Sequence, residues 1–246
     1  MPSTRSPRAR RRLATLVVYV LSAVAIAAGA ALALPPLTSG DAGPRYPVTA
    51  AELGAARAAL GTLEVQGRAP RTGYERELFG EAWADVDGNG CDTRNDVLAR
   101  DLLDPAFRDG TAGCVVQSGT LQDPYGGQRT AFVRGPETSP EVQIDHVVAL
   151  SDAWQKGAQG WDPLTRTAFA NDPANLLAVD GDLNQAKGAG DAATWLPPHR
   201  TFRCRYVMRQ VEVKAAYRLW VTRAERDAIE RELDRCEVAP AATTAP

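Results

Sequence analysis

Histidine is well suited to act as a general base near neutral pH, because its usual pKa of about 6.5 leaves it largely neutral there. The 246-residue chain has two histidines, His146 and His199. His146 follows Asp145 at the end of E-V-Q-I-D-H-V-V, whereas His199 lies in W-L-P-P-H-R without an acidic neighbour in sequence. Neighbouring strand residues point to opposite faces, so Asp145 and His146 can serve one site only where the strand ends or bends. A lone histidine in a strand is more often structural than catalytic.

Three polar residues downstream could complete such a site. Asn175 precedes the apolar stretch L-L-A-V, and Asn184 and Lys187 follow it in L-N-Q-A-K-G. The i, i+3 spacing puts Asn184 and Lys187 on one face of a helix. The alternative for the two asparagines is turn and capping chemistry, and for Lys187 an exposed helical lysine.

These residues need strands and helices that bring them together. Alternation and β-branching predict a strand over 141–148, and L-L-A-V predicts a second short strand over 176–179. Short strands are also expected in the Gly- and Pro-rich region 108–140. Capping boxes predict the starts of the first and last of the expected helices. Helices are expected over 50–60, 74–84, 94–104, 151–158, 163–170, 203–219 and 222–236, with another beginning at 181–188.

The order strand, loop, strand, helix, with D-H, N and N-x-x-K at those places, resembles the His-Asn-His (HNH) endonucleases, the ββα-metal nucleases. More closely, the chain is similar to secreted HNH-family proteins related to the C-terminal domain of GmrSD-like restriction endonucleases. Asn184 stands at the third position of the signature, a departure from the family name that many members share. The resemblance covers residues 70–236 and includes G-Y-E-R-E-L-F, C-D-T-R-N-D-V-L, I-D-H-V-V-A-L, D-A-W-x-K-G-A, F-A-N-D-P-x-N-L-L-A-V, N-x-x-K-G and W-L-P-P.

The resemblance implies an α+β fold. It would be a mainly helical single domain around a small ββα-metal core, with disulfide bonds that stabilise it. His146 would take a proton from the attacking water, and Asp145 and Asn184 would hold one divalent metal. Two oxygen ligands with open positions suit a hard cation, so Mg²⁺ is the expected ion, with Mn²⁺ or Ca²⁺ as alternatives.

The resemblance also assigns roles to residues around the metal. Asn175 would fix the loop that carries His146 through backbone hydrogen bonds, and Lys187 and Arg94 would neutralise phosphate charge. The implied function is an exported, metal-dependent endonuclease that hydrolyses DNA, with RNA as a second substrate class, and leaves 5′-phosphate and 3′-hydroxyl ends. No base-reading element is evident, so low sequence specificity is expected.

Two other functions stay open on the sequence. One is a catalytically inactive extracellular binding module that keeps the ββα scaffold and a structural calcium loop. The other is a phosphodiesterase that uses the same metal chemistry without being a nuclease. The enzyme requires His146 and Asp145 together with metal, whereas the binding module would tolerate alanine at both positions.

The overall charge excludes one class of nucleic-acid binder. Five of the 28 basic residues and none of the 30 acidic ones precede residue 35, so the remainder is acidic. Coating nucleic acid by bulk charge needs a broad positive field, which this chain lacks. Arg205/Arg209 and Lys214/Arg218 are i, i+4 pairs, so the helix 203–219 can still present basic stripes to phosphates. Arg205, Arg209 and Lys214 are the candidate nucleic-acid-binding residues. A solvated helix face is the alternative.

A second candidate metal site resembles the first half of an EF-hand loop. Asp85, Asp87 and Asn89 have the required spacing, and Asp96 falls at the last ligand position. Calcium prefers a bidentate glutamate where Asp96 stands, and Cys91 interrupts the loop. The alternative is an Asp/Asn/Gly turn held by a disulfide.

The N-terminal segment has the pattern of a sequence that targets a protein to a membrane. The first twelve residues are rich in arginine, and residues 13–34 carry no charge. This run is longer than the roughly 7–15 residues of a signal-peptide core and close to the ~20 of a spanning helix. It predicts a secreted or cell-surface protein anchored by a transmembrane segment at 1–34, with a cleaved signal peptide as the alternative.

The rest of the chain is predicted to have three parts: a linker with a short helix at 35–69, the nuclease domain at 70–236 and a disordered tail at 237–246. No protein partner is evident, and the membrane is a partner if the segment stays uncleaved.

Export allows disulfides, because the compartments outside the cytoplasm are oxidising. Cys91, Cys114, Cys204 and Cys236 form an even set with three pairings in principle. Proximity in sequence favours Cys91–Cys114 and Cys204–Cys236.

Overall fold

The computed structural model describes residues 46–136 and 138–240. They form helices and two small antiparallel sheets, which confirms the α+β class. They belong to one compact unit that begins at Pro44. The predicted N-terminal segment 1–34, the linker as far as residue 45 and the end of the predicted tail from residue 241 lie outside the described residues. Within the two described ranges, no helix has the length and apolar character needed to cross a membrane.

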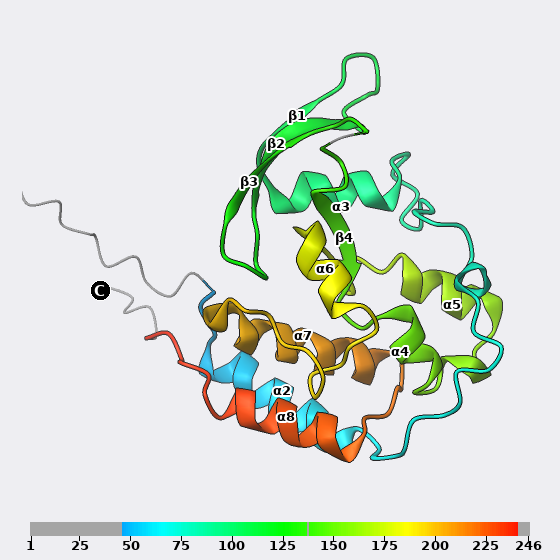
Figure 1. The fold of residues 1–246 in the computed structure, drawn as a ribbon, viewed down its shortest axis with the longest axis vertical. Helices are drawn as coiled ribbons and strands as arrows, with labels where there is room; N and C mark the ends of the chain where they lie inside the picture. The colour runs from blue at the N-terminus through cyan, green and yellow to red at the C-terminus, as the bar shows by residue number, and fades with distance from the viewer. Residues whose placement is uncertain (1–45, 137, 241–246) are drawn as a thin grey trace, which may run out of the picture. The chain divides into compact units, whose positions relative to one another are not determined.

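Three helices pack against one another in the lower part of Figure 1. Leu60, Val211 and Ile229 are among the apolar side chains buried between them. Residues 46–69, assigned above to a linker with a short helix, contribute the first of these helices, so the folded unit begins well before residue 70. Capping boxes start the first and the last helix, as predicted. The helices are α2 (Ala50–Thr62), α7 (Arg203–Ala216) and α8 (Arg223–Leu233).

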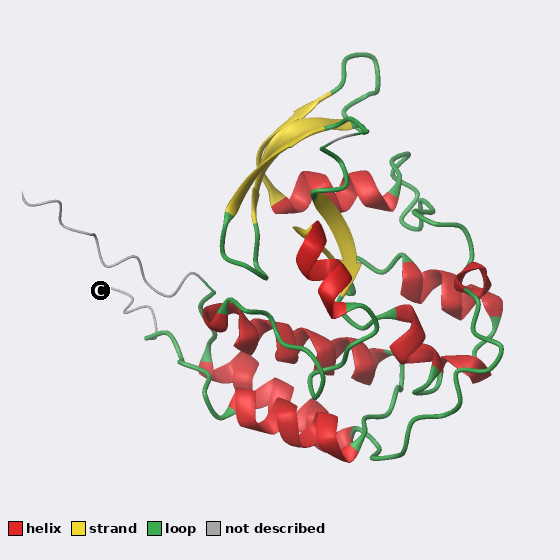
Figure 2. Ribbon diagram, viewed as in Figure 1, coloured by secondary structure: helices red, strands yellow, loops and turns green. Residues whose placement is uncertain are grey.

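A three-stranded antiparallel sheet lies in the upper part of the view and is drawn in yellow in Figure 2. One helix packs against two of its strands. This helix was expected over 94–104 but ends at Asp101, because Pro105 lacks an amide hydrogen and disfavours a helical conformation of the preceding Asp104. The elements are α3 (Thr93–Asp101), β1 (Leu102–Phe107), β2 (Val116–Gln122) and β3 (Arg129–Val133), with the strand order β1-β2-β3.

The second sheet has two antiparallel strands, β4 (Val142–His146) and β5 (Leu176–Asp180), in which His146 pairs with Leu176. The helix α6 (Gly181–Lys187) follows β5 directly, and its first turn is capped by the carboxylate of Asp180. Glycine is required at the start of α6, because a side chain at Gly181 would lie 2.2 Å from the carbonyl oxygen of Pro140. The predicted order of strand, loop, strand and helix is therefore present.

Short helices connect these parts. The helix expected over 74–84 is only a 3₁₀ turn, because Gly80 ends it with a φ of 82° and lies directly against Thr167. The helix expected over 151–158 also stops early, shortly before Gly157 takes a φ of 132°. The connecting elements are η1 (Arg76–Phe79), α4 (Leu150–Trp154), η2 (Ala158–Gly160), α5 (Pro163–Ala170) and η3 (Arg200–Phe202).

A cluster of buried charges joins α4, α7 and α8. Lys156 lies within 2.6–2.8 Å of carboxylate oxygens of Asp152, Asp191 and Glu225. Lys214 lies 2.9 Å from Asp152 and 2.9 Å from Glu225. Because each ammonium group has acidic partners, the cluster meets the requirement that buried charges be paired.

Both disulfides favoured by sequence proximity are present. Cys91–Cys114 ties the segment before α3 to the segment before β2, and Cys204–Cys236 ties the first turn of α7 to the segment after α8. One disulfide therefore stabilises the part of the fold around α3 and β2, and the other stabilises the pair of helices α7 and α8.

Candidate active site

Asp145 and His146 are the last two residues of β4, and both line one surface cavity of about 300 Å³. Because the strand ends at His146, neighbouring residues can face one site there. Asn184 of α6 lines the same cavity. So do Arg71 and Arg76, two exposed arginines that precede α3 in the chain. The cavity therefore gathers an imidazole, a carboxylate, an amide and two guanidinium groups.

The imidazole of His146 is held in one orientation. Its Nε2 lies 2.8 Å from the carbonyl oxygen of Ala170. A carbonyl only accepts hydrogen bonds, so Nε2 carries the proton and Nδ1 keeps the lone pair. Burial lowers the pKa of His146 to about 3, and the positive charges of Arg76 and Lys187 act in the same direction. The ring is therefore neutral at mild pH, with Nδ1 as the atom that can accept a proton.

Asp145 is buried and held by two donors. Tyr125, in the turn between β2 and β3, donates its hydroxyl hydrogen to Oδ2 over 2.5 Å. The ammonium group of Lys187 lies 2.9 Å from Oδ2, 3.0 Å from Oδ1 and 2.8 Å from the carbonyl oxygen of His146. Burial raises the pKa of Asp145, whereas Lys187 and Tyr125 stabilise the carboxylate and oppose that rise. Tyr125 and Lys187 together hold the carboxylate of Asp145 in one position at the cavity.

Asn175 holds the segment that follows His146. Its Oδ1 accepts a hydrogen bond from the amide of Val148 over 2.8 Å, and its Nδ2 donates to the carbonyl oxygen of Val148 over 3.2 Å. The side chain is completely buried and lines no part of the cavity at β4. Its contacts are those of a residue that positions backbone, and its contribution to catalysis stays a prediction.

The oxygens at the cavity fit one hard divalent cation. Asn184 donates from Nδ2 to Oε1 of Gln143 over 2.8 Å, which leaves its amide oxygen as the ligand atom. A carboxylate offers about four lone-pair sites, so Asp145 can bind Tyr125 and Lys187 and still reach a cation. Among residues 46–136 and 138–240, no group of three or more His, Cys, Asp or Glu side chains is placed to hold a metal. Water and substrate oxygens would therefore complete the coordination, as Mg²⁺ commonly allows.

Lys187 and Arg94 are not placed to contact a phosphate in this cavity. Lys187 is buried and directed at Asp145 and the His146 carbonyl, so its ammonium donors are already engaged. Arg94 lies over the ring of Phe132, 6.0 Å from its centre, and lines no part of the cavity. Arg71 and Arg76, in contrast, do line the cavity.

The three candidate nucleic-acid-binding residues of α7 contact other parts of the protein, and their binding of nucleic acid stays a prediction. Arg205 forms an ion pair with Glu52 of α2 at 2.7 Å. Arg209 donates to backbone carbonyl oxygens of residues 173–176. Lys214 is buried in the charge cluster described above. Arg205 and Arg209 are half-buried, whereas Lys214 is buried, so the three side chains do not form one exposed basic face.

The predicted calcium loop is a turn closed by its own hydrogen bonds. The carboxylate of Asp85 accepts hydrogen bonds of 2.8–3.2 Å from the backbone amides of residues 88–90, and these bonds lower its pKa. The side chain of Asn89 donates to both Asp87 and Asp96. These contacts are the Asp/Asn/Gly turn that was the alternative interpretation. Calcium binding at this turn stays a prediction.

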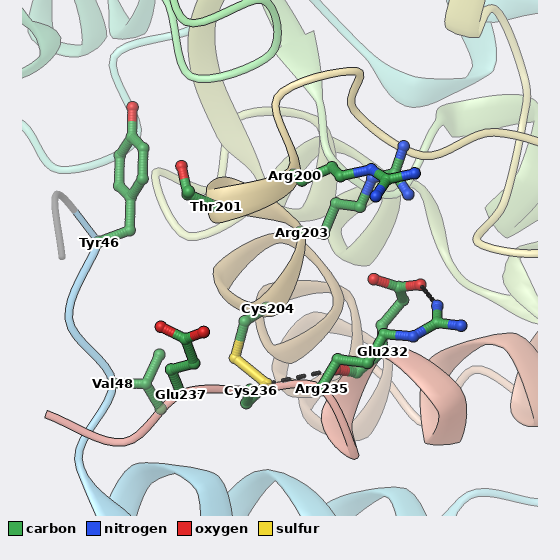
Figure 3. Close-up of a pocket in the computed structure, with 10 residues that line it drawn as sticks. All are labelled: Tyr46, Val48, Arg200, Thr201, Arg203, Cys204, Glu232, Arg235, Cys236 and Glu237. Atoms are coloured by element: carbon green, nitrogen blue, oxygen red, sulfur yellow. Dashed lines mark hydrogen bonds and ion pairs between the residues drawn. A yellow bond between two sulfur atoms is a disulfide. The ribbon is translucent and has the colours of Figure 1, made fainter.

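A separate cavity of about 400 Å³ lies beside the Cys204–Cys236 disulfide (Figure 3). Two of its arginines are engaged with protein: Arg203 donates to the carbonyl oxygen of Pro197, and Arg235 pairs with Glu232. The cavity shares no lining residue with the cavity at β4. We assign it no catalytic role.

Sequence reasoning missed Arg71, Arg76 and Tyr125. Arg76 lies within the motif G-Y-E-R-E-L-F, and that motif was the signal available for it. Tyr125 has no local signal, because its hydroxyl reaches Asp145 from a turn that is 20 residues away in the chain.

Comparison with known proteins places these observations in a family. A family model described as GmrSD restriction endonucleases, C-terminal domain, matches residues 92–232. An uncharacterized secreted protein of Arthroderma benhamiae is 38% identical over 183 residues, which is 74% of this chain and 84% of that protein. No solved structure matches the chain. The description of the relative as secreted contradicts the predicted localisation of an anchored protein, so the transmembrane anchor and the membrane partner are withdrawn.

Proposed function

Because the chain belongs to the family of GmrSD restriction endonuclease C-terminal domains, we propose that it is a secreted, metal-dependent endonuclease of the HNH type. Its substrate is DNA, with RNA as a second class, and cleavage leaves 5′-phosphate and 3′-hydroxyl ends with low sequence specificity. The observation that carries the proposal is the single cavity shared by Asp145, His146 and Asn184. The pairing of β4 with β5 and the helix α6 directly after β5 support their assignment to a ββα-metal core.

In the proposed reaction, Nδ1 of His146 takes a proton from the water that attacks the phosphorus atom. The bond from phosphorus to the 3′ oxygen breaks, and that oxygen takes a proton from solvent. The Nε2 bond to Ala170 fixes the direction of the ring. Burial leaves the free ring unprotonated and also lowers its basicity. Arg71 and Arg76 bind the non-bridging phosphate oxygens, where negative charge grows in the transition state.

Asp145 and Asn184 would hold the divalent metal, which when bound supplies Lewis-acid stabilisation of the phosphate and of the leaving oxygen. Tyr125 and Lys187 hold the carboxylate of Asp145 in place for this task. Asn175 fixes the backbone two residues beyond His146. The base and the metal ligand at the end of β4 are thus positioned by residues of the β2–β3 turn, of the segment before β5 and of α6.

Plasmid digestion by the purified full chain tests the proposal, with EDTA, Mg²⁺, Mn²⁺ or Ca²⁺ in parallel. We expect nicking that requires metal and that His146→Ala reduces at least about 100-fold, since a general base contributes roughly 10²- to 10⁴-fold. His199→Ala is the matched control, because it removes the other histidine, which does not line the cavity.

Equal nicking by the wild type and His146→Ala would contradict the assignment of the base. Absence of cleavage of both plasmid and single-stranded DNA with every metal, from folded and oxidised protein, would favour the inactive binding module. A mononucleotide ester assayed beside the plasmid separates a nuclease from the broader phosphodiesterase, because a nuclease should strongly prefer the polymer.

A further inference from the structure

A second cavity, of about 240 Å³, adjoins the one at β4. Arg76, His146 and Leu150 line both cavities, so the two meet along these side chains. Phe79 and Trp83 contribute to the mainly apolar remainder of the second cavity. A cavity of about 150 Å³ can hold a benzene molecule, so this one has room for a planar aromatic ring system. The proposed chemistry at Asp145 and Asn184 leaves this space unused.

Trp83 presents an aromatic ring at this cavity. The ring centre lies 6.5 Å from that of His146, and the two planes differ by 16°. The residue is half-buried, and its φ of 64° lies in the left-handed region, where a bulky side chain is strained. The carbonyl oxygen of Trp83 accepts a hydrogen bond from the amide of Thr93, which anchors the strained residue to the start of α3. Strain of this kind persists where the surrounding structure enforces it, and it is concentrated at functional sites.

The two adjoining cavities match the two chemically different parts of a nucleotide. The cavity at β4 carries guanidinium groups, an imidazole and metal-ligand oxygens, which suit a phosphate. The second cavity carries an indole ring and a mainly apolar lining that also includes Glu77 and Glu81, and the ring suits a base. Arg76 stands where the two cavities meet, and its charge can bind a phosphate while the base enters beyond it.

We propose that the second cavity is a nucleobase subsite, in which the base next to the scissile phosphate stacks on Trp83. The inference rests on the proposed nuclease function and adds a substrate class to it. Stacking accepts every base, because each has a π-face, so the subsite is compatible with low sequence specificity. A base inside a duplex cannot enter such a pocket without leaving its stack. The preferred substrate is therefore single-stranded or locally unpaired nucleic acid.

The test compares a dinucleotide that has one phosphodiester bond with its two abasic counterparts, each lacking one base. Binding to the full chain is measured in EDTA by isothermal titration. We expect removal of one of the two bases to weaken binding at least about fivefold, the lower end of the range for a stacked base. In Trp83→Ala this dependence on the base should vanish, whereas Trp83→Phe should keep it.

Two variants complete the design. Trp220→Ala is the matched control, because Trp220 donates to the carbonyl oxygen of Gly67 and lines neither cavity. Trp83→Leu removes the aromatic face but keeps an apolar side chain, so it gives the same answer as Trp83→Ala if the alanine variant does not fold. The circular dichroism spectrum and the unfolding temperature establish which variants are folded.

If both abasic ligands bind with the same affinity as the parent dinucleotide, the subsite proposal is wrong. Equal weakening of the parent and abasic ligands by Trp83→Leu would overturn it as well. If single-stranded DNA is cleaved but the effect of removing a base does not depend on Trp83, the subsite proposal is wrong and the nuclease proposal stands. If that effect depends on Trp83 but no metal supports cleavage, the subsite proposal stands and the nuclease proposal is wrong.

Discussion

The ammonium group of Lys187 lies 2.9 Å from Oδ2 and 3.0 Å from Oδ1 of Asp145. Both side chains are buried, so the ion pair is formed away from bulk water. Lys187 also donates to the carbonyl oxygen of His146 and thereby fixes the backbone of the proposed base and the carboxylate of the proposed metal ligand together. Asn184, three residues earlier in α6, lines the cavity instead. One helix thus supplies a positioning cation and a candidate ligand.

Replacing Lys187 by methionine should strengthen the binding of a divalent cation. The ammonium group competes with such a cation for the carboxylate of Asp145, so its removal should raise the affinity for Mn²⁺ about tenfold, which corresponds to ~1.4 kcal/mol. Isothermal titration of Mn²⁺ into the full chain measures the effect. Gln185→Met, at an exposed position of α6, is the control. Weaker binding by Lys187→Met would show instead that the loss of this positioning of Asp145 outweighs the loss of competition for its carboxylate.

Tyr125→Phe should destabilise the fold and slow cleavage. It removes the 2.5 Å hydrogen bond to Asp145, and a bond to a charged group contributes about 1.5–3 kcal/mol. Denaturant unfolding measures the stability, and the rate with saturating DNA measures the activity. Tyr206→Phe is a matched control, because Tyr206 is equally buried but accepts from the neutral amide of Gln210. Unchanged activity in Tyr125→Phe would remove Tyr125 from the positioning of Asp145.

Asn175→Ala should lower kcat more than it changes KM. It leaves the amide and carbonyl groups of Val148 without their partner, and each buried unsatisfied group costs about 1–3 kcal/mol. The segment after His146 should then shift, which misplaces the base without altering substrate contacts. Asn184→Ala is the contrasting variant: it should lose metal binding in a titration while the free energy of unfolding changes little. A larger effect of Asn175→Ala on KM than on kcat would indicate a contact with substrate.

The buried charge cluster should make stability depend on pH in the acid range. Burial alone would raise the pKa of Asp152, but Lys214 and Lys156 outweigh burial and bring the pKa to about 2, below the usual 3.8. A carboxylate whose pKa is lowered by folding stabilises the protein above its unfolded pKa, and this contribution is lost as the pH falls through the folded value. We therefore expect the free energy of unfolding to fall between about pH 4 and pH 2.

Chemical denaturation at a series of pH values measures this effect. Asp152→Asn should remove much of the decrease between pH 4 and pH 2, because amide nitrogen does not titrate in that range. Asp182→Asn, at an exposed position of α6, should leave the decrease in place. An identical pH profile for all three proteins would mean that other carboxylates cause the decrease.

Local sequence determined the elements that carry the site. Alternation of apolar residues predicted β4, the apolar run L-L-A-V predicted β5, and the following polar segment predicted α6, each within about two residues of its observed bounds. The capping boxes and the favoured disulfide pairs were also readable, because they depend on residues close together in the chain. Local signals failed at residues 74–84, where Gly80 and its contact with Thr167 replaced most of a helix by a turn.

The tertiary structure decided which charged and aromatic groups surround the cavity. Helical periodicity identified i, i+4 pairs of basic residues on α7, but it could not tell whether they meet water, and Lys214 proved to be buried against acids of α4 and α8. Arg71, Arg76 and Tyr125 reach Asp145 and His146 from distant segments. Such approaches depend on how sheets and helices pack, because a side chain's partners are set by the element opposite it. Sequence spacing carries that information only within one element.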